Sequence, residues 1–368
     1  MYRSAKVLSL YGACQRRSLL AVAASAVLAF LPIGSIANAG DIEWVTVGDP
    51  GNTADTDGYG EVSTSFHIMK YEFTNQHYTN FLNSVAATAD PYSLYNVGMS
   101  SGAGGISFDP LAASGSKYAV RSNMGDKPVC YVSWFDAARV SNWLMNGATS
   151  SSSTETGAYT LVSGQISGTA PAVNPGATFY VPSDDQWYKA AFYKGAGTNA
   201  GYWEYATQVT GTAPTAVNAT STGNGTSGGV SPLTTGNFAN WNRDADWNSL
   251  DGNTTTVGTN GGPSAYGTFD MSGNMFEWND LTGAAGSLRA IRGGGWSWFR
   301  SDFLSSDFIY SLDAATEAED IGFRLASSVS GPSGVPEIDP ATGGSALSLV
   351  AGVLAMIEQR RRRATLVA

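Results

Sequence analysis

Carboxylates stand among aromatic side chains in the segment FDMSGNMFEW, residues 269–278. Asp270 and Glu277 carry the charges, and Phe269, Phe276 and Trp278 frame them. A solvated loop has no need of these rings, and an apolar strand does not tolerate an ionised carboxylate without a partner. The segment therefore predicts buried carboxylates that have a partner. The two candidates are a bound metal ion and the backbone amide groups around the loop.

Soft metal ligands are scarce in this chain. Its two cysteines are Cys14 and Cys130, and its two histidines are His67 and His77. Cys14 lies in an N-terminal targeting segment, so one thiol remains, which excludes an internal disulfide and a thiolate metal cluster. Two histidines offer little to a histidine-based metal site or a catalytic triad. We expect His67 to be structural and His77 to lie at the surface.

Residues 1–39 have the layout of a secretory signal peptide. Basic residues come first, an apolar run follows, and the small-residue sequence Ala37, Asn38, Ala39 ends the segment. This order is typical of a signal that signal peptidase removes. A retained membrane anchor is the alternative.

Residues 331–368 have the layout of a second targeting signal. VPEIDP at 335–340 is followed by an apolar stretch, 346–357, and by four arginines, 360–363. The stretch is short for a transmembrane segment, and the arginines favour the cytoplasmic side. The order resembles the PEP-CTERM sorting signal, which implies processing by an exosortase-type membrane protease, a transient inner-membrane anchor and release at the cell surface. A plain C-terminal anchor is the alternative.

The domain between these ends is strongly acidic. The ends hold eight of the 20 basic and three of the 30 acidic residues, so 12 basic residues face 27 acidic ones in 40–334. Nucleic acid is not expected as a partner, because nothing would offset phosphate repulsion. Divalent cations suit this charge balance.

Hydrophobic spacing and cap residues predict a few regular elements. We expect strands at 41–47, from 65 to about 73, at 128–132, at 288–298 and at 320–327. We expect helices that start after Thr74 or Asn75, after Ser133, and after Ser183, where Gln186 occupies the capping-box position. Residues 84–126 are expected to form a polar loop region.

Residues 196–265 consist largely of Gly, Thr, Asn and Ser, with aromatic residues at intervals. The aromatic residues indicate that the segment is pinned to a core. They are Trp203, Tyr205, Phe238, Trp241 and Trp247. Ordering a loop costs about 1–2 kcal/mol of backbone entropy per residue, and bound calcium is an economical way to offset that cost.

Six segments together resemble the formylglycine-generating enzyme family, also called sulfatase-modifying factor domains. In order they are PVCYVSWFDAARVSNWL (128–144), YVPSDDQWYKAAFY (180–193), YWEYAT (202–207), FDMSGNMFEWND (269–280), RAIRGGGWSW (289–298) and IGFRLA (321–326). The resemblance implies one domain over 40–330 with an α+β, C-type-lectin-like fold, rich in loops and low in regular secondary structure. It also implies that Arg324 forms a buried ion pair.

The same resemblance implies two calcium sites. In the first, side-chain oxygens of Asp270 and Glu277 join the carbonyls of Gly273 and Met275. In the second, which is more compressed in this chain, the ligands are Asn240, the Trp241 carbonyl, Asp251 and the Asn253 carbonyl. Calcium accepts such mixtures of carboxylate and carbonyl oxygens. In the alternative, Asp270 and Glu277 only accept hydrogen bonds from backbone amides.

Catalytic family members bind copper(I) through two cysteines and oxidise a substrate cysteine. Alignment of RAIRGGGWSWFRSDF on that pattern places Trp298 and Phe303 at the cysteine positions, and copper(I) needs soft thiolates. Copper and the family oxidase activity are therefore not expected, and no catalytic residue is assigned. A related branch takes a histidine triad from an additional helical domain, which this chain lacks.

Aromatic side chains and an arginine cluster in residues 296–303, a composition that is typical of binding hot spots. The expected ligand-binding residues are Trp296, Trp298, Phe299, Arg300 and Phe303, although about half of the rings could belong to the core. We expect a calcium-stabilised, exported module that binds a protein or a glycan at the cell surface. One alternative is an enzyme with displaced chemistry on Asp184, Asp185 and Glu204. Another is a diversified ligand-binding protein of the same fold.

Overall fold

The computed structural model describes residues 42–162 and 164–328. The predicted signal peptide and the predicted sorting signal lie outside these residues. Three α-helices are present in this part of the chain: α1 (Asn75–Val85), α2 (Trp134–Met145) and α3 (Asp184–Phe192). Short 3₁₀ helices, η2 and η3, occupy Val97–Ser100 and Ser301–Leu304. Within the described residues, no helix has the length and apolar character needed to cross a bilayer.

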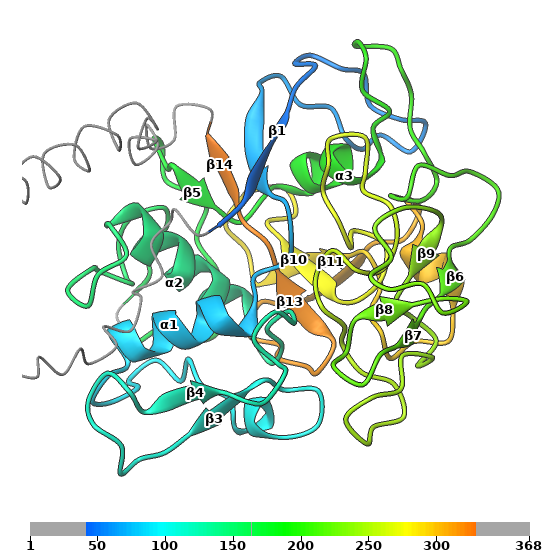
Figure 1. Cartoon of the computed structure of the whole chain (residues 1–368). Coiled ribbons are helices and arrows are strands. Elements are labelled where there is room, and N and C mark those ends of the chain that lie inside the picture. The colour runs from blue at the N-terminus through cyan, green and yellow to red at the C-terminus, as the bar shows by residue number, and fades with distance from the viewer. Residues whose placement is uncertain (1–41, 163, 329–368) are drawn as a thin grey trace, which may run out of the picture. The chain divides into compact units, whose positions relative to one another are not determined.

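Two four-stranded sheets organise the domain (Figure 1). The first has the order β1-β2-β14-β5 and contains β1 (Trp44–Val47), β2 (Phe66–Met69), β5 (Phe179–Tyr180) and β14 (Ala326–Ser328). The second has the order β12-β11-β10-β13 and contains β10 (Phe276–Asn279), β11 (Leu288–Arg292), β12 (Tyr310–Asp313) and β13 (Ile321–Phe323). In the first sheet the last strand pairs with β2, so the beginning and the end of the domain are joined by backbone hydrogen bonds.

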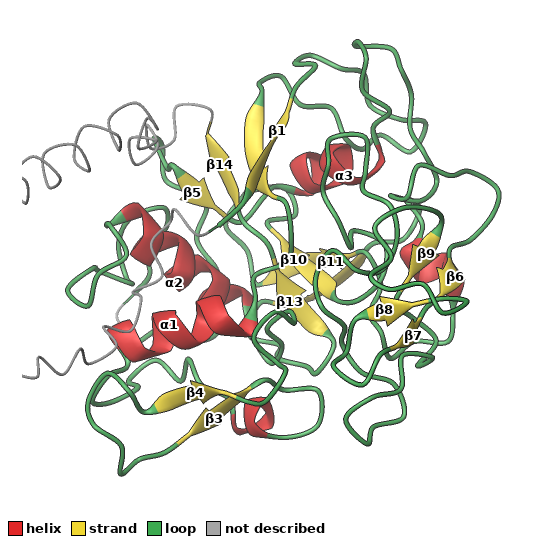
Figure 2. Cartoon of the chain, viewed as in Figure 1, coloured by secondary structure: helices red, strands yellow, loops and turns green. Residues whose placement is uncertain are grey.

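Three smaller pairs complete the strand content, and loops make up most of the remaining chain (Figure 2). They are β3 (Ile106–Phe108) with β4 (Tyr118–Val120), β6 (Thr215–Ala216) with β9 (Phe238–Ala239), and β7 (Asn218–Ala219) with β8 (Gly225–Thr226). This confirms the predicted α+β, loop-rich class.

The three predicted helices start at the predicted caps. Thr74 accepts a hydrogen bond from the His77 amide at the start of α1. Ser133 and Ser183 begin α2 and α3 with complete capping boxes, which satisfy amide groups that would otherwise lack partners. α1 and α2 pack together in the main core, where Phe81 meets Trp143 edge to face with ring centroids 5.3 Å apart.

The second sheet has one apolar and one polar face. Trp278 and Ile291, which are paired across β10 and β11, point into the main core. The neighbouring positions Glu277 and Arg292 are also paired, and they point to the opposite face because strand side chains alternate. Helix α3 covers this polar face with Asp184 and Trp187, as their hydrogen bonds below show.

Several local predictions were wrong. The strand expected at 320–327 forms two strands, Ile321–Phe323 and Ala326–Ser328, which belong to different sheets, and the strand expected to reach about 73 ends at Met69. No strand forms at 128–132, where only an isolated bridge joins Thr74 to Pro128, and Tyr131 has a φ of 57°, which interrupts an extended chain. The strand predicted over 288–298 ends at Arg292, because Gly293 and Gly294 both have positive φ. β3 and β4 lie inside the segment that was expected to be a loop.

The prediction that 196–265 is pinned to a core is confirmed. Tyr205 is 5% exposed and joins a small cluster with Leu304. The indole N–H of Trp241 donates to the Pro214 carbonyl at 3.0 Å, and that of Trp247 donates to the Thr254 carbonyl at 2.8 Å. Each indole therefore fixes a stretch of backbone that forms little regular structure.

The capping residue Asp136 makes the stability of the domain depend on pH. Burial, followed by the charge of Glu317, raises the pKa of Asp136 from 3.8 to about 7, against the hydrogen bonds from Ser133. The folded state thus holds this proton more tightly than the unfolded chain. The contribution of Asp136 to stability therefore falls as the pH rises from 3.8 to about 7.

We predict that Asp136→Asn makes the free energy of unfolding fall less steeply over this pH interval. Urea titrations at a series of pH values measure the slope. The exposed Asp109→Asn should keep the wild-type slope. Equal slopes for the wild type and Asp136→Asn would contradict the prediction.

Candidate functional site

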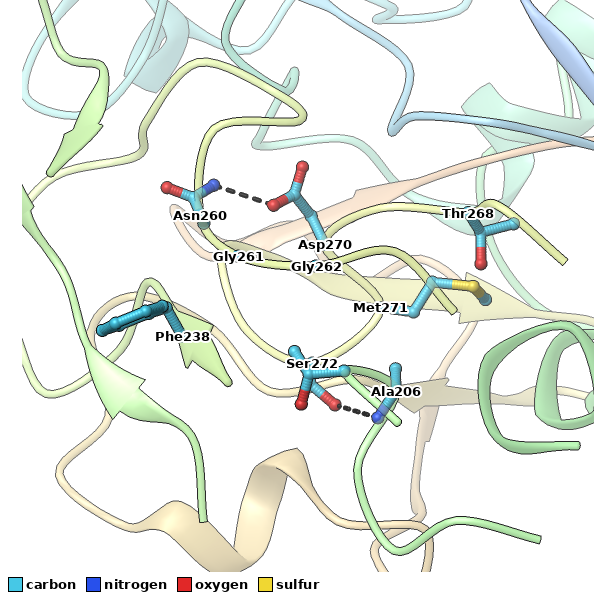
Figure 3. A pocket seen from close by; sticks show the side chains of 10 residues that line it. Ala206, Phe238, Asn260, Gly261, Gly262, Thr268, Asp270, Met271 and Ser272 are labelled. Carbon is cyan, nitrogen blue, oxygen red and sulfur yellow. Dashed lines mark hydrogen bonds between the residues drawn. The ribbon is translucent and has the colours of Figure 1, made fainter. Parts of the chain in front are cut away.

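Asp270 is held in a tight turn by donors from one neighbouring loop (Figure 3). Its carboxylate accepts hydrogen bonds from Asn260 Nδ2 at 2.8 Å and from the Gly258 amide at 2.5 Å. Its backbone has a φ of 61°. Beside it is a cavity of about 10 Å³, also lined by Phe238 and Ser272, which has room for about one water molecule. Burial raises the pKa of Asp270, and the two donors lower it.

Glu277 has an arginine as its partner. Its carboxylate accepts from Arg324 Nε and from a second guanidinium nitrogen, each at 2.6 Å, and from the indole of Trp187 at 2.8 Å. Both members of the ion pair have fully buried side chains. Arg324 also donates to the carbonyls of Met69 and Phe269. The predicted buried ion pair of Arg324 is confirmed.

The first predicted calcium set does not fit a calcium ion with Glu277 as a ligand. Arg324 and Trp187 already occupy the Glu277 carboxylate, and the Gly273 carbonyl accepts from the Met275 amide at 3.0 Å. Among the described residues, no group of three or more His, Cys, Asp or Glu side chains is close enough to hold a metal ion. Hydrogen-bond donors of the protein therefore bind the carboxylates of both Asp270 and Glu277.

The second predicted set fits a cation better, because it contains a buried oxygen that lacks a partner. Asn240 is fully buried, and its Nδ2 donates to the Asn253 carbonyl at 2.9 Å. Its Oδ1 is buried without a hydrogen-bond partner. Asp251 is exposed, and the Trp241 carbonyl accepts a long hydrogen bond from the Asp244 amide. Asn240 and Asn253 are therefore brought together, and Asn240 Oδ1 is free for a ligand.

The rings at the predicted ligand-binding position divide between surface and core. Trp298 and Phe299 are 45% and 65% exposed. Phe303 is half-buried and meets Trp298 edge to face, with ring centroids 5.1 Å apart. Trp296 is only 5% exposed, so it packs in the core and offers no face to a ligand. Arg300 is exposed and forms an ion pair with Asp302.

An arginine that was not predicted from the sequence lies at this surface. The guanidinium of Arg243 lies 5.2 Å from the ring centroid of Phe299, and its Nε donates to the Ser297 carbonyl at 3.1 Å. Arg243 belongs to the loop-rich segment 196–265, so only the fold brings it to the rings. We define the ring surface as Trp298, Phe299, Arg300, Phe303 and Arg243.

Cys130 is close to Trp296 but closed off from solvent. It packs in a small cluster with Met275 and Trp296 and is 1% exposed. Burial raises the pKa of its thiol well above the usual range, which opposes formation of the thiolate that metals and oxidants require. It is the only cysteine among the described residues.

The carboxylates considered for displaced chemistry have structural partners. Asp184 accepts from Arg292 at 2.6 and 2.8 Å and from Asn279 at 2.8 Å, all in the interior. Asp185 accepts from the Gly60 amide at 2.9 Å, and Glu204 accepts from the Gly211 amide at 2.6 Å.

Arg292, which shortly precedes the rings in the sequence, is fully buried on Asp184. A second buried ion pair, Arg289 with Asp280, was not predicted from the sequence. Arg289 Nε lies 2.7 Å from Asp280 Oδ1. Asp280 shortly precedes Arg289 in the chain, which could have indicated their pair, whereas Asp184 is 108 residues from Arg292 and no local signal connects them.

Family comparison agrees with this architecture. Residues 44–329 match the model of the sulfatase-modifying factor enzyme 1-like domain. The chain belongs to this family. Residues 335–365 match a VPEID-CTERM protein sorting domain, which confirms the predicted sorting signal and indicates an exported protein that is processed at the cell envelope. No curated protein matches the chain.

The comparison with solved structures finds matches of low sequence identity. Treponema denticola variable protein 1 has 16% identity and a TM-score of 0.43, covering 77% of this chain and 94% of its own. CarF has 20% identity and a TM-score of 0.43, covering 78% and 98%. PvdO from Pseudomonas aeruginosa has 16% identity and a TM-score of 0.38, covering 78% and 92%.

We predict that Asp184→Asn lowers the free energy of unfolding by about 3–5 kcal/mol, because it leaves the buried Arg292 without a counter-charge. The adjacent Asp185→Asn is the matched control. It should cost much less, since Asp185 is half-buried and accepts only a backbone amide. Chemical denaturation of the two variants measures both values, and equal losses would contradict the assignment.

Proposed function

We propose that this exported member of the sulfatase-modifying factor family is a binding module for a protein or glycan, and that it does not carry out the family's copper-dependent oxidation. The observation that supports this most directly is the contact between Trp298 and Phe303. These two residues stand where the family resemblance places the copper-binding cysteines. Their ring centroids are 5.1 Å apart, so two aromatic side chains are in contact where the resemblance places two sulfur donors.

The thiol of Cys130 cannot replace the missing pair of copper ligands. Copper(I) requires soft donors, and a single buried thiol cannot supply a pair. Cys130 is enclosed by Met275 and Trp296. The proposal therefore assigns no catalytic residue and no copper.

The ring surface has the composition of a recognition site. Trp298 and Phe299 expose large apolar faces, and Arg243 and Arg300 place guanidinium groups against Phe299 and Phe303. Exposed aromatic residues with adjacent arginines dominate binding energies at protein interfaces, and aromatic faces also stack on sugars. Trp298 and Phe303 pack against each other, so little side-chain entropy of these two rings is lost when a ligand binds.

We further propose that calcium stabilises the module at the second ligand set. The buried, unpartnered Oδ1 of Asn240 supports this, together with the Asn253 carbonyl, which accepts a hydrogen bond from Nδ2 of the same side chain. Asp251 would supply the charged ligand and the Trp241 carbonyl a fourth oxygen. Calcium there would fix the loops between 240 and 255 against the entropy that favours their unfolding.

The targeting signals define the proposed route of the protein. Signal peptidase would remove residues 1–39, and an exosortase-type protease would act on the VPEID-CTERM segment at 335–365. The apolar part of that segment would hold the protein transiently at the inner membrane until it is released to the cell surface. The acidic domain makes nucleic acid an unsuitable partner.

We predict that the protein, reconstituted with copper(I), does not oxidise a cysteine-containing peptide above the rate with copper alone. Trp298→Cys combined with Phe303→Cys should create tight copper(I) binding, because the family resemblance places the two copper-binding cysteines at these positions. Either single substitution should bind copper(I) much more weakly. Copper-dependent turnover by the unmodified protein would overturn the proposal.

Ligand screening tests the binding role itself. The protein is applied to glycan and bacterial surface-protein arrays, and each positive is repeated with Phe299→Ala. This variant should lower the affinity about tenfold or more, as expected for an interface hot spot. Leu111→Ala, which trims an exposed apolar side chain beside the β3–β4 hairpin, is the control and should have no effect. Ligands that bind Phe299→Ala as tightly as the wild type would contradict the assignment of the ring surface as the binding site.

We predict that calcium raises the melting temperature and that a chelator reverses the effect. Asp251→Asn should abolish the calcium response, because it removes the only charged ligand of the proposed set. Asp244→Asn, at a nearby exposed position, should preserve it. If calcium does not change the melting temperature of the wild type, the calcium proposal is wrong, and the binding proposal is unaffected.

A further inference from the structure

Arg243 differs from the other arginines of the described residues because its guanidinium has neither a carboxylate partner nor a backbone carbonyl on its terminal nitrogens. Of the seven arginines in 42–162 and 164–328, five form an ion pair with a carboxylate. Those five are Arg139, Arg289, Arg292, Arg300 and Arg324. Arg121 forms no ion pair, but a terminal nitrogen donates to the carbonyls of Gly102 and Gly104. The side chain of Arg243 donates only through Nε, to the Ser297 carbonyl at 3.1 Å.

The two terminal nitrogens of Arg243 reach solvent. They form no hydrogen bond with the described residues, and neither is among the buried side-chain atoms that lack a partner. The next acidic residues along the chain are engaged elsewhere. Asp244 accepts from Asn242 Nδ2 at 3.2 Å, and Asp246 accepts from the Gly252 amide at 2.8 Å. Arg243 therefore presents a planar pair of donor nitrogens, which matches the two oxygens of a carboxylate.

A strained backbone brings Arg243 to the ring surface. Asn242 and Arg243 have φ angles of 66° and 59°, in the left-handed region that residues with a Cβ seldom adopt. The Asn242 amide donates to the Trp298 carbonyl at 2.9 Å, and the Arg243 amide donates to the Trp296 carbonyl at 3.0 Å. These bonds hold the loop against the segment that carries the rings. Strain of this kind is frequent at sites that clamp a ligand.

Gly252 leaves the space that the aliphatic stem of Arg243 occupies. A Cβ on Gly252 would lie 2.7 Å from Cα and Cβ of Arg243 and 3.0 Å from its Cγ. The guanidinium at the end of this stem lies 5.2 Å from the ring centroid of Phe299, and Phe299 is 65% exposed. Two free donor nitrogens and an exposed apolar ring are thus held next to each other.

A ligand that satisfies both groups carries an anion beside an apolar face. A carboxylate fits the terminal nitrogens of Arg243, and a C–H face fits the ring of Phe299. The domain is acidic as a whole, so a small anion gains no long-range attraction and needs the ring contact as well. A uronic acid unit of a glycan combines the two features, because its carboxylate is attached directly to a sugar ring. An acidic peptide side chain offers the carboxylate with little apolar surface.

We propose that Arg243 and Phe299 form a subsite for the uronate units of an acidic polysaccharide, with the carboxylate on the terminal nitrogens of Arg243 and the sugar ring against Phe299. This inference rests on the proposed function of the ring surface and names the class of its ligand. Arg243 is then the residue that selects an acidic sugar over a neutral one, since a neutral sugar leaves its charge without a partner.

The test titrates the full exported protein with tetragalacturonate and with its methyl ester, monitored by calorimetry and by NMR shifts. Tetragalacturonate should bind saturably. The methyl ester keeps the sugar rings and loses the charges, so it should bind at least about tenfold more weakly. Acetate at the same concentration should not bind, because it has no apolar face. An acetylated and amidated tetraglutamate, which carries the same number of carboxylates on a peptide, should also bind at least about tenfold more weakly than the glycan.

Variants assign the carboxylate contact to one side chain. Arg243→Gln should weaken tetragalacturonate binding at least about tenfold and change binding of the methyl ester little. Arg243→Lys keeps the charge but loses the planar pair of donors, so it should restore only part of the affinity. Lys117→Gln removes one positive charge beside the β3–β4 hairpin and should keep the wild-type affinity. The comparison of the acid with its ester in the wild type does not depend on how any variant folds.

Four outcomes would overturn the proposal. They are no saturable binding of tetragalacturonate up to concentrations on the order of 1 mM, equal binding of the methyl ester, unchanged binding by Arg243→Gln, and equal or tighter binding of the acidic peptide. The array experiment separates this inference from the proposed function. If the arrays yield neutral ligands that depend on Phe299, the proposed function stands and the uronate subsite is wrong. If neither the arrays nor tetragalacturonate give binding, both are wrong.

Discussion

The buried ion pair between Glu277 and Arg324 is the interaction on which the architecture depends. Glu277 lies on β10 in the second sheet, and Arg324 lies in the short segment between β13 and β14, where the chain passes from the second sheet to the first. The guanidinium also binds the carbonyls of Met69 and Lys70 at the end of β2, and Trp187 of α3 donates to the carboxylate. One pair of side chains thus joins two sheets and a helix. A buried pair of this kind is costly to break, because either partner alone would remain as an uncompensated charge.

This arrangement explains how a domain with little regular structure can present a defined surface. Asp184 with Arg292 fastens α3 to β11, and Arg289 with Asp280 closes the other end of the same strand. After β11, the glycines at 293 and 294 turn the chain outward to the ring surface. The rings therefore follow directly after a strand that two buried ion pairs hold in place, which would suit the proposed role in recognition.

The sequence predicted those features that depend on local rules. Thr74, Ser133 and Ser183 identified the helix starts because a capping residue acts on the next three residues of its own chain. The six motifs identified the family and with it the fold. The partner of Glu277 could not be read from its neighbours, since Arg324 is 47 residues away and meets it only through the pairing of β10 with β13. The positive φ of Tyr131, which ended an expected strand, has no signal in a residue of that type.

The most direct measurement is a double-mutant cycle on Glu277 and Arg324, using Glu277→Gln, Arg324→Met and both together, in calcium and in chelator. If Arg324 is the partner of Glu277, the coupling energy from chemical denaturation should be at least about 2 kcal/mol and the same in both conditions. A coupling energy near zero, or a loss on Glu277→Gln that is seen only in calcium, would show that the carboxylate serves a metal ion instead.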